Sequence, residues 1–282
     1  EVPVEIGRFY QKHILLIESS EEVISGLNIE NFIANNIELG FQNKGIWVTD
    51  GVAAQCKEYD INYFTIEQFL TIHLSKVIKR HVSEFLGIQE VKNMLDKIND
   101  YQDLIRELMR MLPLNKLTEI LQRLVAEDIP IRNFKVILDS LLEWSQREKE
   151  VVLLVEYVRI ALGRYIAHKY SSMDGLITCF LLESEIEEAI RDAIRFNEKG
   201  SYLAMDPNLE LEIVESIRDR YAQQQDKQKI TPVIITHMDV RRYLYSIIEK
   251  EMKFVMVLSF QEVEMHAKLH PLGIIELDGE RE

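Results

Sequence analysis

The sequence has few cysteines and no long apolar run. Its two cysteines, Cys56 and Cys179, lie far apart in 282 residues and in no CxxC arrangement. A secreted disulfide scaffold would have more of them, so we expect two reduced thiols in a cytosolic compartment. No apolar run approaches the roughly 20 residues that a membrane-spanning helix needs. The opening residues, Glu1 to Glu5, lack the pattern of a signal or transit peptide.

Glycine is also sparse, and the signatures of common nucleotide and hydrolase sites are missing. The 11 glycines are never two positions apart, so no GxG turn can bring the backbone close to a pyrophosphate. The sequence contains neither a GxxxxGK[ST] loop nor a GxSxG nucleophile elbow. We therefore expect a chain that is not an enzyme and that binds no cofactor.

The sequence has fewer basic residues than acidic ones. Lys and Arg total 33 against 47 for Asp and Glu, which gives a formal net charge of −14. Nucleic acids are bound through clusters of cations that neutralise phosphates. This balance argues against a nucleic-acid partner, and equally against an anionic membrane surface.

What the sequence does contain predicts a mixed α+β fold that begins with strands. Short β-branched runs at Val2–Ile6, Lys12–Ile17 and Gly45–Thr49 predict strands. Apolar residues then recur every three or four positions from Thr65, which predicts a helix that ends at Gly87. Thr65 followed by Gln68 fits the capping-box pattern.

Amphipathic helices follow from Gln89 to Tyr170, with breaks predicted at Pro113 and at Ile129–Ile131. Asn133 is the predicted N-cap of the next helix. The stretch Val151–Tyr165 is apolar on nearly all sides, apart from Glu156, Arg159 and Arg164. A helix of that kind belongs in the middle of a bundle.

From Ser172 onward, predicted strands and helices alternate, which favours an α/β region with a partly parallel sheet. The predicted strands are Leu176–Leu182, Pro232–Ile235 and Phe254–Leu258, with a short extended stretch before a break at Asp206–Pro207. The predicted helices are Ile186–Phe196, Asn208–Gln225 and Val240–Ile248.

A metal site is conceivable near the C-terminus. His266 and His270 are four residues apart with Glu262 and Glu264 upstream, a spacing that a helix would bring to one face. Pro271 follows at once, however, so we expect a polar connection with solvated side chains and no metal.

Three other groups were weighed for chemistry. His73 and His81 are eight residues apart, too far for one ion, and Cys56 has an adjacent lysine but no obvious base. The acidic cluster Glu183–Glu188 suits a helix N-terminus. We expect structural or surface roles for all of them, and no catalytic residue.

Nine segments match the pattern of one known family, in order along nearly the whole chain: Thr71–His81, Glu84–Val91, Leu121–Glu127, Ile129–Asn133, Ile137–Leu138, Glu156–Arg164, Gly200–Pro207, Val257–Val263 and Pro271–Gly273. In these segments the sequence resembles the major export-gate family of flagellar and injectisome type III secretion.

This resemblance implies four subdomains. The first would be discontinuous, residues 1–25 and 64–87, and would lack the family's first strand and helix. A second, residues 26–63, would be inserted in it. A helical subdomain would span 88–170 and a C-terminal α/β subdomain 171–277, followed by a tail, 278–282. The membrane bundle of the family would precede the chain.

The resemblance also implies a non-enzymatic ring at the cytoplasmic face of the bacterial inner membrane. The domain would form a nonamer that docks secretion chaperones with their bound substrates and sorts those substrates. It would also meet gatekeeper and export-apparatus or ATPase-complex components. A soluble helical adaptor or scaffold, and an uncommon α/β enzyme, are the alternatives.

The family's chaperone site is a hydrophobic dimple between the first two subdomains. Phe41 aligns with its aromatic residue, six positions before Trp47. Glu38 stands where flagellar members have Asp, and Ile72 where they have Thr. The lost hydroxyl favours the injectisome branch. The alternative is that Phe41 is a loop aromatic folded into the core.

Overall fold

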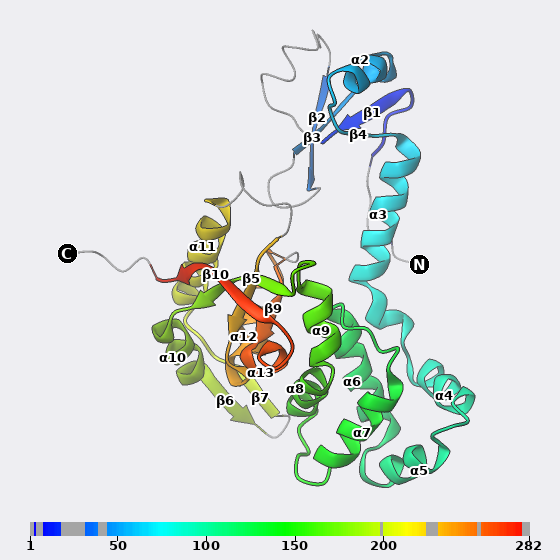
Figure 1. Ribbon diagram of the computed structural model, residues 1–282, viewed down its shortest axis with the longest axis vertical. Coiled ribbons are helices and arrows are strands. Elements are labelled where there is room, and N and C mark those ends of the chain that lie inside the picture. Colours follow the sequence, from blue (N-terminus) through cyan, green and yellow to red (C-terminus); the bar gives the residue numbers. More distant parts are fainter. Residues whose placement is uncertain are drawn as a thin grey trace, which may run out of the picture. The chain divides into compact units, whose positions relative to one another are not determined.

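The computed structural model divides into two compact units, residues 1–81 and 82–282 (Figure 1). It describes residues 3, 8–17, 32–38, 44–197, 200–223, 231–252 and 255–277. Within these ranges, no helix has both the length and the apolar character needed to cross a bilayer.

Unit 1 is built on a four-stranded antiparallel sheet. Its order is β2-β3-β1-β4, formed by β1 (His13–Leu16), β2 (Phe32–Glu38), β3 (Lys44–Thr49) and β4 (Tyr63–Phe64). The strands predicted at Lys12–Ile17 and Gly45–Thr49 are confirmed. The strand predicted at Val2–Ile6 lies outside the described residues, apart from Pro3. Strand β2 was not predicted, because its Asn-rich sequence lacks the β-branched alternation that signals a strand.

Helices cover the two faces of this sheet. Side chains alternate along β1 and β3, so Leu16 and Val48 face one way while Leu15 and Trp47 face the other. Cys56, on α2 (Ala53–Glu58), packs on the first face. Phe69, on α3 (Ile66–Arg80), packs on the second. Helix α2, which follows a 3-10 turn at Asp50–Val52, was not predicted.

The predicted start of α3 is confirmed but its predicted end is wrong. Thr65 and Gln68 form the complete capping box. The helix ends at Arg80, and the 3-10 turn Val82–Phe85 follows. Apolar residues continue at the same spacing across this break, so the pattern alone could not locate it.

The helical stretch of unit 2 is confirmed. It contains α4 (Ile88–Lys97), α5 (Gln102–Met111), α6 (Leu114–Ala126), α7 (Phe134–Trp144), α8 (Val151–Ala161) and α9 (Gly163–Tyr170). The single helix predicted over Val151–Tyr165 is two, with the break at Leu162. Asn133 precedes α7 without a capping bond, since its Nδ2 donates instead to the Tyr165 hydroxyl at 2.7 Å.

The alternation of strands and helices predicted a partly parallel sheet in the C-terminal region. The four-stranded sheet found there is parallel throughout. Its order is β10-β5-β8-β9, formed by β5 (Leu176–Leu182), β8 (Val233–Thr236), β9 (Val257–Ser259) and β10 (Lys268–Ile275). Helices α10 (Ser184–Ala193), α11 (Pro207–Ala222), α12 (Met238–Ile248) and α13 (Phe260–Val263) accompany it, with the hairpin β6 (Ile194–Asn197) and β7 (Gly200–Leu203) (Figure 1).

Three expectations here need correction. The helix predicted to Phe196 ends at Ala193, where the hairpin begins. The chain does change from strand to helix at Asp206–Pro207, but α11 begins at Pro207 rather than at Asn208, and the Asp206 carboxylate caps it by accepting from the Asn208 N–H at 2.8 Å. The expected connection through His270 is α13 followed by edge strand β10, and Pro271 is tolerated there because the register shifts beside it.

One continuous core joins the helices of unit 2 to the parallel sheet. Buried residues from α4 to α9 pack with Ile177, Cys179, Ile235 and Leu258 of three strands. In unit 1, β1 and β3 likewise share one sheet although we expected them in different subdomains. The mixed α+β class is confirmed, and the four-part division stays a prediction.

We predict that Phe69→Ala destabilises unit 1 by about 3 to 5 kcal/mol, because it removes the aromatic contact between α3 and the sheet. Leu70→Ala is the matched control, since Leu70 is its neighbour on α3 and is 41% exposed. Urea unfolding followed by tryptophan fluorescence measures both. Equal losses for the two variants would show that Phe69 does not anchor the helix.

Candidate docking site

An aromatic cluster in unit 1 holds α3 against the sheet. The rings of Trp47 and Phe69 meet edge to face at a centroid distance of 5.1 Å, and Tyr10 meets Trp47 at 6.0 Å. Trp47 has no exposed surface. It can therefore position strand β3 but cannot itself touch a partner in this conformation, which limits the role that we assigned to it.

The other predicted docking residues lie around this cluster. Ile72 is half-buried on α3, one turn beyond Phe69. Glu38 ends β2, where its backbone pairs with Lys44. The side chain of Glu38, and the whole of Phe41, lie outside the described residues. The structure thus places Trp47 and Ile72 in one unit and leaves the Phe41 prediction untested.

Sequence reasoning missed an apolar stripe on α3. Leu70, Leu74 and Ile78 are 41%, 59% and 46% exposed and follow one another at intervals of four residues. Residues at that spacing lie on one helix face. The same periodicity predicted the helix, but it could not show that this face stays exposed among the described residues of unit 1.

Two side chains weighed for chemistry have structural roles. The ring of His73 stacks on Phe69 at 5.8 Å. Cys56 is fully buried in the core, where burial raises the pKa of its thiol. Burial also raises the pKa of Cys179 to about 11. A raised pKa keeps both sulfurs as unreactive thiols at neutral pH.

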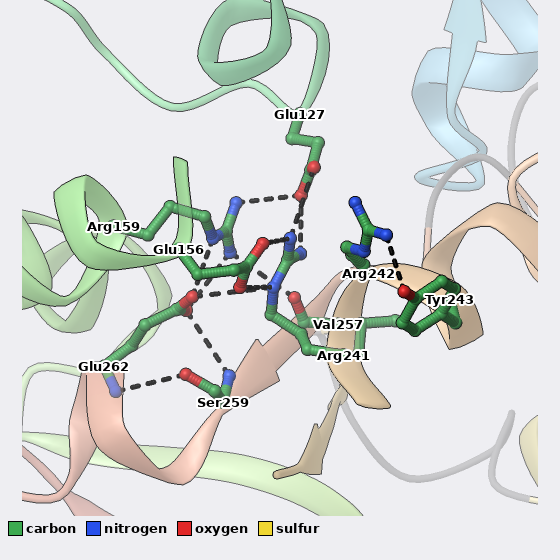
Figure 2. Close-up of polar contacts among 9 residues, drawn as sticks. All are labelled: Glu127, Glu156, Arg159, Arg241, Arg242, Tyr243, Val257, Ser259 and Glu262. Atoms are coloured by element: carbon green, nitrogen blue, oxygen red, sulfur yellow. Dashed lines mark hydrogen bonds and ion pairs between the residues drawn. The ribbon is translucent and has the colours of Figure 1, made fainter. Parts of the chain in front are cut away.

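Unit 2 contains a buried cluster of two arginines and three glutamates, which Figure 2 shows. Arg159 on α8 binds Glu262 on α13 at 2.6 Å and Glu127 at the end of α6 at 2.8 Å. Arg241 on α12 binds the same Glu127 oxygen at 2.6 Å. Its Nε also donates to Glu156 on α8 at 2.6 Å. The cluster thus joins α8, α12 and α13 to the C-terminal end of α6.

The pKa values in this cluster reflect burial opposed by charge. Burial raises the pKa of Glu127, but Arg241 and Arg159 outweigh it, so that the pKa lies below its ordinary value. Burial dominates at Glu156 and raises its pKa despite Arg241. Both arginines stay charged. Removing one of them would leave a carboxylate buried without compensation, which is strongly destabilising.

The sequence contained a signal for this cluster that we did not use. Glu156 and Arg159 were noted only as interruptions of an apolar helix, and Glu262 as part of a conceivable metal site. A charged residue on a helix that is otherwise apolar all round must be paired inside the core. Glu262 is buried and committed to Arg159 and to the capping box of Ser259, so it is not the solvated side chain that we expected.

A second polar cluster lies at the carboxyl end of β8. Glu187 on α10 accepts from the Thr236 hydroxyl at 2.5 Å and from the His237 N–H at 3.1 Å. Its other oxygen meets the His237 ring at 2.7 Å and Arg191 at 3.2 Å. Burial raises the pKa of Glu187, but these hydrogen bonds outweigh it and the pKa lies below its ordinary value.

Comparison with known proteins identifies the family to which this chain belongs. The FHIPEP family model matches residues 1–268. The chain belongs to the FHIPEP family. Its similarity to "Low calcium response locus protein D" of Yersinia pestis is 37% identity over 277 residues, covering 98% of this chain and 39% of that protein.

Solved structures agree with this FHIPEP assignment. The Chlamydia pneumoniae CdsV protein, solved in complex with CdsO, is 38% identical with a TM-score of 0.81, covering 96% of this chain and 77% of that one. The nonameric EscV cytosolic domain from the type III secretion system is 32% identical with a TM-score of 0.71, covering 95% and 78%.

The FHIPEP family is that of type III secretion export gates, so the resemblance expected from the sequence is confirmed. The relatives come from secretion systems of pathogens, which agrees with the injectisome branch. The chain spans about two fifths of the length of the Yersinia pestis protein.

We predict that Arg241→Met lowers the free energy of unfolding by about 3 to 5 kcal/mol, because Glu127 and Glu156 lose a partner while most of the side-chain volume is kept. Arg123→Met is the control, since its ion pair with Glu119 is about half exposed and worth less than about 1 kcal/mol. Chemical denaturation measures both, and similar losses would contradict a special role for the cluster.

We predict that Glu187→Gln destabilises the chain near neutral pH but progressively less in acid. The folded pKa of Glu187 lies below its unfolded value of about 4.3, so its contribution is full above that value. It is lost as the pH falls through the folded pKa. Urea unfolding across this range tests it, with exposed Glu188→Gln as the control. A difference that widened in acid would contradict the assignment.

Proposed function

We propose that this chain is the cytoplasmic domain of an inner-membrane export gate, which forms a nonameric ring and docks chaperone–substrate complexes for sorting and export. The observation that supports this most strongly is its likeness to the nonameric EscV cytosolic domain, at a TM-score of 0.71 over 95% of the chain. Similarity of this extent includes residues of both units, which supports a shared mode of assembly.

In this proposal the docking surface lies in unit 1. Phe41 is the apolar anchor of this proposal and Glu38 and Ile72 are further contact residues, while buried Trp47 holds strand β3 in position. The rigid aromatic contact between Trp47 and Phe69 supports this placement, because β3 and α3 are then held together before a partner arrives. A preformed surface loses less conformational entropy on binding.

The partners proposed are secretion chaperones with bound substrates, gatekeeper proteins and components of the export apparatus and its ATPase complex. The complex of CdsV with CdsO supports the general point that a domain of this architecture binds a further component. The membrane would be reached only through a transmembrane region that precedes this domain in the whole protein.

Calorimetric titration of this domain with cargo-loaded secretion chaperones, at physiological salt, tests the proposal. We predict saturable binding that Phe41→Asp weakens by about 1 to 3 kcal/mol or more, as expected for loss of a buried aromatic anchor. Phe9→Asp is the matched control, because Phe9 is also in unit 1 and is 50% exposed. It should bind like the unaltered chain.

Two outcomes would contradict the proposed site. Loss of cooperative thermal unfolding in Phe41→Asp would mean that Phe41 belongs to the core. Equal weakening by Phe9→Asp and Phe41→Asp would mean that the effect is not local. Sedimentation of the domain over a range of concentrations tests the ring separately, since a domain that stays monomeric throughout would argue against self-assembly in isolation.

A further inference from the structure

The outer strand of the parallel sheet, β10, has an irregularity that leaves one position on its face without a side chain. Its pairing with β5 shifts between Pro271 and Gly273, so that Gly273 rather than Leu272 lies opposite Phe180. Bulges of this kind change which side chain points to a given face of a sheet. The face concerned is the one that Phe180 shares with helix α11, which packs against β10 (Figure 1).

The guanidinium of Arg220, on α11, fills this position. A Cβ atom on Gly273 would lie 2.0 Å from Nη2 of Arg220 and 3.0 Å from its Cζ, so only glycine leaves room for the group. The Cζ atom also lies 5.9 Å from the centre of the Phe180 ring, which is within the range of a cation–π contact. The ring and the strand backbone therefore hold the guanidinium in place before any partner arrives.

Arg220 has no anionic partner in the part of the chain that the structure describes, whereas Arg218 on the same helix is paired with Glu251. The Nε atom of Arg220 is buried and has no hydrogen-bond partner among the described residues. Nη1 and Nη2 have no such partner either, but they are not buried, so a carboxylate can reach them from solvent. A half-buried charge without a partner is costly, and a carboxylate on the outer nitrogens would reduce that cost.

Two further side chains extend this surface along β10. Lys268 and His270 are exposed, and neither forms an ion pair with a residue that the structure describes. They pair in register with Leu176 and Thr178, which lie on the same face of β5 as Phe180. Successive positions on one face of a strand are about 7 Å apart, so these two side chains and the guanidinium form a row of about 13 Å.

We propose that Lys268, His270 and Arg220, which we call the β10 strip, bind an acidic segment of another protein. One carboxylate would accept hydrogen bonds from Nη1 and Nη2 of Arg220, the fork geometry that a guanidinium favours. A second carboxylate would lie near the Lys268 ammonium group. The chain has a net charge of −14, but charges farther away than about 8 Å are largely screened at physiological salt, so the local cations decide the contact.

The chemistry of the β10 strip favours a separate protein over a second copy or the end of this chain. The next β10 side chain on this face, Ile275, is buried, so the β10 strip has no exposed apolar centre. Stable contacts between copies have such a centre and bury roughly 800 Å² per partner. The chain leaves β10 after Ile275, at the end of the strand away from Lys268, so a segment that covers the whole β10 strip comes from elsewhere.

The test uses the 282-residue chain and a fluorescently labelled twelve-residue Gly/Ser peptide with three glutamates at alternate positions. In an extended peptide these glutamates have the spacing of the β10 strip. Fluorescence anisotropy measures binding, which we expect to be saturable and to weaken as salt rises. In Arg220→Gln the affinity should fall at least about tenfold, a loss of about 1.4 kcal/mol. A peptide with glutamine in place of glutamate should not bind measurably.

Two further variants separate this site from general charge attraction. Gly273→Ala changes no charge, but its Cβ atom displaces the flexible end of Arg220. The affinity should fall at least about fivefold because the fork is misplaced, while cooperative thermal unfolding is kept. Arg164→Gln removes an exposed arginine of α9 that likewise forms no ion pair with a described residue. It should keep the affinity within about twofold of the unaltered chain.

Four results would overturn the proposal. An equal loss of affinity in Arg220→Gln and Arg164→Gln would mean that only net charge matters. Unchanged affinity in Gly273→Ala would mean that the position of the guanidinium is irrelevant. Tighter peptide binding after removal of residues 278–282 would make the end of the chain the occupant. Self-association of the unaltered chain that Arg220→Gln abolishes in sedimentation would make a second copy the occupant.

Discussion

The buried pairing of Arg159 and Arg241 with three glutamates is the interaction on which the architecture of unit 2 depends. These residues come from α6, α8, α12 and α13, so each ion pair crosses between elements distant in sequence. Apolar contacts could hold the same elements together in several registers. Charges buried in a dry core tolerate far fewer arrangements, because every displacement leaves one of them unpaired.

In unit 1, aromatic rings fix the position of the helix on the sheet. Trp47 and Phe69 meet edge to face between sheet and helix, while Leu16 and Val48 fill the opposite side of the sheet. A small sheet with two covered faces is stable without a large core. The apolar stripe of α3 is left outside this arrangement, which is consistent with a unit that meets other surfaces in an assembly.

Patterns of neighbouring residues predicted an element correctly where its whole sequence fits one pattern. The capping box of α3 and the apolar strand β5 are of this kind. Failures occurred where a tertiary contact decided the outcome. Helix α8 ends before Gly163, and the polar-looking stretch through His270 becomes strand β10 because β5 supplies its hydrogen-bonding partner. Neither cause is visible in a window of neighbouring residues.

The candidate sites show the same contrast. The family resemblance predicted docking roles for Phe41, Glu38 and Ile72, and these stay predictions, whereas only burial could show that Trp47 is wholly internal. The ion cluster had a sequence signal in the charges of α8, but the partners of these charges lie 32, 85 and 103 residues away in the sequence.

The position of Gly163 restricts which substitutions the ion cluster can tolerate. A Cβ atom at this position would lie 2.3 Å from the Glu262 carbonyl oxygen, closer than any two such atoms approach. Even alanine would therefore push α13 away from α9, and with it the carboxylate that neutralises Arg159. A single substitution at this position is therefore not tolerated. Homologues must keep the glycine, or change the neighbouring turn and its charged residues at the same time.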